Sequence, residues 1–66
     1  MQILLNGKPL ELEVAINVKD LLEQNGYEGK IVAVACNGEF IPKEAYTDTI
    51  IQSDDKIEVV APMQGG

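Results

Sequence analysis

The fold of this chain is decided by the stretch IVAVACNGEFI, residues 31–41. Its first six residues are continuously apolar and largely β-branched, which predicts a strand over Ile31–Cys36 that is buried on both faces. Asn37-Gly38 is typical of a two-residue hairpin turn, because both residue types readily adopt positive φ. Glu39–Ile41 then forms a short strand that ends at Pro42. The centre of the chain is therefore predicted to be a β-hairpin.

A second hairpin is predicted at the start of the chain, around Asn6-Gly7. Apolar residues alternate with other residues on both sides of this dipeptide, and a period of two indicates strands over residues 2–6 and 9–14. Pro9 lacks a backbone N–H, so we expect it at the start or the edge of its strand.

A helix over residues 18–25 is predicted between the two hairpins. Asn17 is a suitable N-cap residue, and Asp20 occupies the capping-box position three residues later. Gly26 supplies the C′ residue at which a helix commonly stops. The apolar positions are spaced i, i+3 and i+4, which gives one narrow stripe suited to packing on a sheet: Val18, Leu21 and Leu22.

The rest of the chain predicts a single turn or loop over 43–49, a turn over Ser53–Asp55 and a last strand over Ile57–Ala61. We expect the first and last strands to lie side by side in parallel, with the helix covering one sheet face. This is an α+β arrangement with a mixed sheet and one main helix packed on one face, the β-grasp or ubiquitin-like roll. Residues 1–61 form one domain, and residues 62–66 form a flexible C-terminal tail.

Composition argues against an enzyme. The chain has 66 residues, which is enough for one small domain and leaves no structure for a deep catalytic cleft. It has no His, so no side chain has an ordinary pKa near neutrality, and all five basic residues are lysines, so no Arg is present to grip phosphate. The formal net charge of −6 disfavours binding to nucleic acid or to an anionic membrane.

Cys36 is the only cysteine, which excludes an internal disulfide and favours a reducing, cytoplasmic location. We interpret it as a small buried apolar residue rather than a reactive thiol. No signal peptide is expected, and the longest apolar run has far fewer than the ~20 residues of a membrane helix. No metal site is expected either, because the carboxylates are spread over several elements without a His or Cys cluster: Glu11, Glu13, Glu23, Glu28, Asp54 and Asp55.

The last five residues, Pro62-Met63-Gln64-Gly65-Gly66, carry the chemical information. Two glycines make the thinnest and most pliable peptide end, so they could thread a narrow channel and place the Gly66 carboxylate inside another protein. A carboxylate becomes an acyl donor once a partner adenylates it with ATP. Such a carrier needs no acid, base or nucleophile of its own. The alternative interpretation is that the two glycines are an incidental flexible end.

The chain resembles the ThiS family of thiamine-biosynthesis sulfur carriers over essentially its whole length. The resemblance is carried by Asn37–Lys43, Tyr46, Asp55–Val60 and Gly65-Gly66, with Met1–Ile3 and Asn6-Gly7 in agreement. One departure is Asp54, where the family often has Gly, and this puts the geometry of that turn in doubt.

The resemblance implies that a ThiF-type adenylating enzyme activates Gly66 and that sulfur derived from a cysteine desulfurase converts it to a thiocarboxylate. Thiazole synthase would then take this sulfur during formation of the thiamine thiazole. Gly66 would bear the sulfur and Gly65 would permit threading. No cofactor is expected on the carrier, since the ATP is used by the activating enzyme.

Two alternatives stay open. One is the small subunit of molybdopterin synthase or a carrier for another sulfur pathway, and the other is a ubiquitin-like binding module or modifier.

A partner-docking patch is predicted on the sheet face that the helix leaves open. If Ile3, Leu5, Ile57 and Val59 face the helix, strand alternation turns Leu4, Glu58 and Val60 outward. Leu4 and Val60 would then be neighbours, with Met63 adding contact area beside the tail.

Overall fold

The computed structural model of the protein describes residues 1–61, and the predicted tail, residues 62–66, lies outside the described residues. The elements, in chain order, are β1 (Gln2–Leu5), β2 (Lys8–Glu11), α1 (Val18–Gln24), β3 (Ala33–Cys36), β4 (Glu39–Ile41), the 3₁₀ helix η1 (Lys43–Ala45) and β5 (Lys56–Val60).

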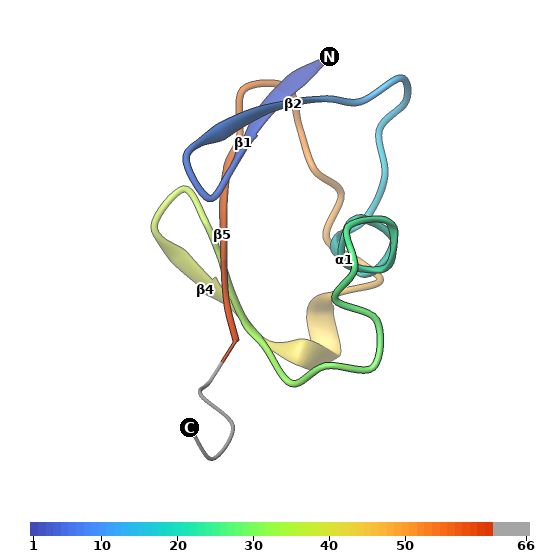
Figure 1. Cartoon of the computed structure of the whole chain (residues 1–66), viewed down its shortest axis with the longest axis vertical. Helices are drawn as coiled ribbons and strands as arrows, with labels where there is room; N and C mark the ends of the chain where they lie inside the picture. Colours follow the sequence, from blue (N-terminus) through green and yellow to red (C-terminus); the bar gives the residue numbers. More distant parts are fainter. Residues whose placement is uncertain (62–66) are drawn as a thin grey trace.

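The strands form one sheet in the order β2-β1-β5-β3-β4. Only β1 and β5 are parallel; β1–β2, β3–β4 and β3–β5 are antiparallel. Figure 1 shows α1 on one side of this sheet, with β5 running between the two hairpins. The predicted α+β, β-grasp arrangement is confirmed, including the parallel pairing of the first and last strands.

The core lies between α1 and the sheet face that it covers, and no buried residue in the range 1–61 is polar or charged. Its members are apolar residues with at most 7% exposure: Ile3, Leu12, Val18, Leu21, Leu22, Val34, Ile51, Ile57 and Val59. Ile51 was not foreseen from the sequence. Its N–H donates to the carbonyl of Ile16 at 2.9 Å, so the segment before β5 is held against the segment before α1.

The signals that delimit α1 act as predicted. The Asn17 side chain accepts a hydrogen bond from the backbone N–H of Asp20 at 2.7 Å, which satisfies one of the free donors of the first turn. The helix ends at Gln24, one residue earlier than predicted, and Gly26 follows with a φ of +88°.

The strand predicted over Ile31–Cys36 is shorter than expected and is not buried on both faces. β3 begins at Ala33, Ile31 is 81% exposed, and only Val34 in the strand is buried. The physical reason is that a single helix covers a single face, so the other face stays open to solvent. The alanines at positions 33 and 35 face that open side, where Ala33 is opposite Val60.

β2 and β5 also end earlier than their apolar pattern indicated. β2 stops at Glu11 rather than at residue 14; Leu12 still enters the core, but Val14 is 67% exposed. β5 spans Lys56–Val60 rather than 57–61. The turn before β5 places Asp54 at a φ of +71°. Asp therefore adopts the left-handed conformation at the position where the resembled family often has Gly.

Candidate functional site

β5 is the strand that leads into the C-terminal tail, and it lies in the middle of the sheet. β1 pairs with it in parallel and β3 pairs with it antiparallel. Ile57 and Val59 point into the core with exposures of 1% and 6%. In Figure 1 the strand runs down the view and ends at the edge of the domain, where Ala61 is the last described residue. The base of the tail is thus anchored by a buried, hydrogen-bonded strand.

The asparagines of the two hairpin turns hold β5 from both sides. Asn6 Oδ1 accepts from the backbone N–H of Val59 at 2.8 Å, and Asn37 Oδ1 accepts from that of Lys56 at 2.9 Å. The backbone N–H groups of the same asparagines donate to Ile57 and Lys56 carbonyls, at 2.8 and 2.7 Å. These bonds set the position of β5 along its neighbours, and so the point at which the tail leaves the domain.

The residues predicted to carry the chemistry, Gly65 and Gly66, and the predicted contact residue Met63 lie outside the described residues. Their roles stay predictions from the sequence.

The predicted orientation of the strands is confirmed, but the predicted contact between Leu4 and Val60 is wrong. Ile3, Ile57 and Val59 are buried, and Leu5 is half-buried against the core. Leu4 is half-buried opposite Lys56, whereas Val60 is opposite Ala33. Lys56 and Val60 are four residues apart on β5, or about 13 Å at the usual rise of a strand. The parallel register of β1 therefore separates the two side chains.

The register creates a different apolar cluster beside the base of the tail, which we call the open-face patch and define as Ala33, Ala35, Phe40 and Val60. Ala35 is opposite Phe40, and Ala33 is opposite Val60. Phe40 and Val60 are 65% and 63% exposed.

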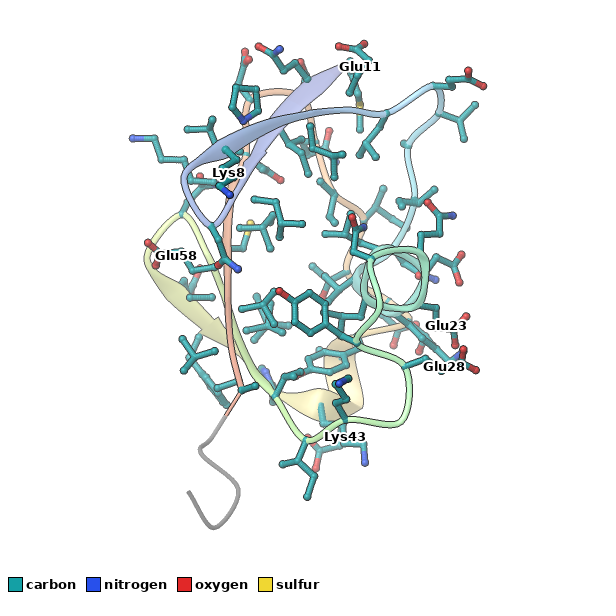
Figure 2. The ribbon with its side chains drawn as sticks, viewed as in Figure 1. Lys8, Glu11, Glu23, Glu28, Lys43 and Glu58 are labelled. Atoms are coloured by element: carbon teal, nitrogen blue, oxygen red, sulfur yellow. The ribbon has the colours of Figure 1, made fainter. Side chains whose placement is uncertain are left out.

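An acidic side chain also lies on this surface. Figure 2 shows Glu58, which is opposite Ala35, on the side of the sheet away from α1. Sequence reasoning missed Phe40 and the two alanines. The alternation of side chains along β3 and β4 indicates which residues share a face. Which of them lie beside Val60 follows only from the pairing of β3 with β5.

Cys36 lies at the end of β3, half-buried and packed against the core. Burial raises the pKa of its thiol above the ordinary value, and the nearby Asp55 carboxylate raises it further. The thiol therefore stays protonated at neutral pH, which agrees with the interpretation of Cys36 as a packing residue, although it is less buried than predicted.

Within residues 1–61, no three His, Cys, Asp or Glu side chains come together as metal ligands would. Neither of the two short helices there has the length and apolar character that a membrane crossing demands.

Comparison with known proteins agrees with this architecture. A family model described as the ThiS family matches residues 3–66. The chain is 44% identical over 62 residues to the sulfur carrier protein ThiS of Thermus thermophilus, covering 94% of this chain and 95% of that protein. It is also similar to the crystal structure of the thiamine biosynthesis protein ThiS from Geobacter metallireducens, with a TM-score of 0.84, 32% identity and complete coverage of both chains.

A second kind of relative is much longer. The whole chain is 33% identical to part of the thiazole synthase of Paramagnetospirillum magneticum, and it spans only 20% of that protein's length. A domain of this kind thus occurs both as a small protein and as one fifth of a longer chain. The family match over 64 of 66 positions, with the five-stranded sheet that its solved relative shares, places this chain in the ThiS family.

Proposed function

We propose that this protein is a sulfur carrier for the thiazole part of thiamine, with the Gly66 carboxylate as the reactive group. A partner activating enzyme uses ATP to convert the carboxylate to an acyl-adenylate, with pyrophosphate leaving. A persulfide formed by a cysteine desulfurase attacks the acyl-adenylate, and AMP leaves. A thiol then cleaves the S–S bond of the resulting acyl disulfide, which leaves a thiocarboxylate on Gly66 and oxidises the thiol to a disulfide. Thiazole synthase takes the sulfur in turn.

The observation that carries this proposal is the anchoring of β5 directly before the tail. The strand is paired on both sides, its inward side chains are buried, and two asparagine side chains hold its backbone. Four residues lie between Val60 and Gly65 in the sequence, and Gly65-Gly66 offers no side chain to obstruct a narrow channel. The matched family region includes both glycines.

The remaining features of the chain support a carrier rather than a catalyst. Its sequence has no His or Arg. The one thiol has a raised pKa, so it is a poor nucleophile at neutral pH. The proposed location is the cytoplasm, where a single unpaired cysteine stays reduced.

The open-face patch is the proposed docking surface for the activating enzyme. Phe40 on β4 and Val60 on β5 are large exposed apolar side chains of this face, and exposed aromatic residues are common anchors at protein interfaces. The collective negative charge of the chain would steer it toward a basic partner surface.

Intact-mass analysis tests the proposed function. The full chain is incubated with the activating enzyme of its organism, ATP, a thiol reductant and a desulfurase with cysteine, and we expect one terminal oxygen to be exchanged for sulfur. A variant lacking Gly66 should show no exchange, because it lacks the carboxylate that is proposed to react. It should still fold, because all the buried core residues named above lie between Ile3 and Val59.

One variant tests the docking surface, and one outcome would contradict the proposed function. The Phe40→Ala variant should still be converted, but at a higher carrier concentration, if the patch docks the enzyme. An unchanged mass of the wild-type chain with an enzyme shown to be active on another carrier would overturn the proposal.

A further inference from the structure

A groove of about 330 Å³ lies on the other side of the sheet, between α1, the loop that follows it and η1. Its floor is apolar. Leu22 belongs to the core, and Tyr27, Val32 and Tyr46 are half-buried against it. The hydroxyl of Tyr46 donates to the Val32 carbonyl at 3.5 Å, and that of Tyr27 accepts from Asn6 Nδ2 at 3.4 Å. The tyrosine hydroxyls thus have partners within the domain, and the groove offers mainly ring and aliphatic surface.

The rim of the groove is the exception to the acidic character of the chain. Three of its five lysines line the groove, namely Lys19, Lys30 and Lys43. Lys19 is paired with Glu23, which raises the pKa of the lysine. Neither Lys30 nor Lys43 forms an ion pair with any residue in the range 1–61.

Glu28 is the remaining carboxylate on this rim. Figure 2 shows Glu23 and Glu28 beside α1, with Lys43 farther down the view, toward the end at which β5 stops. Two exposed ammonium groups next to an apolar floor suit a segment that carries negative charge and an apolar side chain.

The groove continues to the base of the tail. Gly29, Lys30 and Ile31 line both this groove and an adjoining hollow, and among the described residues Ala61 also lines that hollow. Ile31 is 81% exposed there, although it is a large aliphatic residue. A protein that encloses the tail has to surround Ala61, and on this side of the sheet it meets Ile31 and Lys30 first.

We propose that this groove is a second docking surface and that it receives an acidic segment of thiazole synthase, with one apolar side chain of that segment entering between Tyr27 and Tyr46. The inference rests on the proposed function, since it needs a partner that takes up the tail. Thiazole synthase is the partner chosen because relatives of this chain carry the same domain and that enzyme in one polypeptide. Two docking surfaces on opposite sides of one sheet would let the activating enzyme and the synthase recognise the carrier separately.

The test is the affinity of the full chain for thiazole synthase of the same organism, measured by titration calorimetry. The variant Lys30→Glu/Lys43→Glu should bind about tenfold more weakly, since two attractive contacts become repulsive. Lys8→Glu/Lys56→Glu is the matched control, because it changes the net charge equally at exposed lysines outside the groove. It should bind within about twofold of the wild type.

Two single variants show which side of the sheet the synthase binds. Ile31→Ala should weaken binding to the synthase without loss of stability, because the side chain is exposed. Phe40→Ala, on the open-face patch, should leave that binding unchanged.

Equal loss in the groove variant and in its charge-matched control would overturn the proposal, as would wild-type affinity in the groove variant. Thiocarboxylate formation on the Lys30→Glu/Lys43→Glu variant is measured with the activating enzyme. If thiocarboxylate formation is normal and the affinity for the synthase is the same as that of the wild type, the groove is not a docking surface, and the proposed function stands.

Discussion

The two hairpin turns of this domain have the same dipeptide and nearly the same backbone, but their asparagine side chains have different surroundings. The φ angles are +53° and +81° for Asn6-Gly7, and +54° and +84° for Asn37-Gly38. Asn6 accepts from Val59 in a partly buried site, and its amide donates to the Tyr27 hydroxyl. Asn37 accepts from Lys56 in an exposed site, and its amide donates to the Asp55 carboxylate at 3.0 Å.

The same Asn-Gly dipeptide therefore makes different tertiary contacts at the two turns. At both turns Asn-Gly supplies two residues that tolerate positive φ, as the tight hairpin requires. At Asn6 the side-chain oxygen matters most, because an unpaired N–H costs more free energy where water is excluded. At Asn37 the amide hydrogens matter as well, because a carboxylate faces them. The two positions should therefore respond in opposite order to two kinds of substitution.

The largest effect is expected when the side chain is removed but the positive φ is still permitted. Asn6→Gly should lower the free energy of unfolding by about 2 kcal/mol, because it leaves the partly buried Val59 N–H without its acceptor. Asn37→Gly should cost about 1 kcal/mol, since water can reach the exposed Lys56 N–H. Urea unfolding of both variants gives the comparison. The added flexibility of glycine in the unfolded chain is equal at the two positions. A larger loss at Asn37 would contradict this account.

When each asparagine is replaced by aspartate, the larger loss of stability should instead occur at Asn37. Asn37→Asp keeps the acceptor for Lys56 but sets a carboxylate against Asp55, which should cost about 1 kcal/mol at pH 7. Asn6→Asp should be nearly neutral, because the Tyr27 hydroxyl can turn to donate to the new carboxylate.

The pH dependence identifies the cause of that loss. The repulsion exists only while the introduced group is ionised, so the penalty of Asn37→Asp is present near pH 7 and disappears as the pH falls toward about 4. Thermal unfolding of the wild type and both variants at the two pH values measures this. A penalty that is independent of pH would mean that repulsion is not its source.

The smallest effect concerns the reactivity of Cys36, which only the second turn influences. Burial is the main cause of its raised pKa, and the Asp55 carboxylate is the next. Asp55→Asn should lower that pKa and speed alkylation by iodoacetamide at pH 8 on the order of twofold. Asp54→Asn is the matched control, because asparagine also tolerates the positive φ at that position. Equal rates in the two variants would exclude the contribution of Asp55.

Features with a local cause could be predicted well from the sequence. The Asn17 cap, the stop near Gly26 and both hairpin turns depend on residues within a few positions of each other. The chemistry of the Gly-Gly end stays a prediction from the sequence, because both glycines lie outside the described residues. The ends of β2 and β3 were predicted less well, because an apolar run such as Ile31–Cys36 does not say how many faces of its strand are covered.

What the sequence by itself determined is therefore the set of elements, with their turns and caps. Only the tertiary structure decided which side chains meet. The parallel register of β1 on β5 separated Leu4 from Val60, and the antiparallel register of β3 brought Ala33 beside Val60.

The groove on the α1 side likewise joins Leu22 of α1 to Val32 and Tyr46 from separate parts of the chain. The physical reason is range. Propensity, capping and turn formation act between close neighbours in sequence, whereas Asn6 and Val59, 53 positions apart, are brought together only when the whole sheet closes around β5.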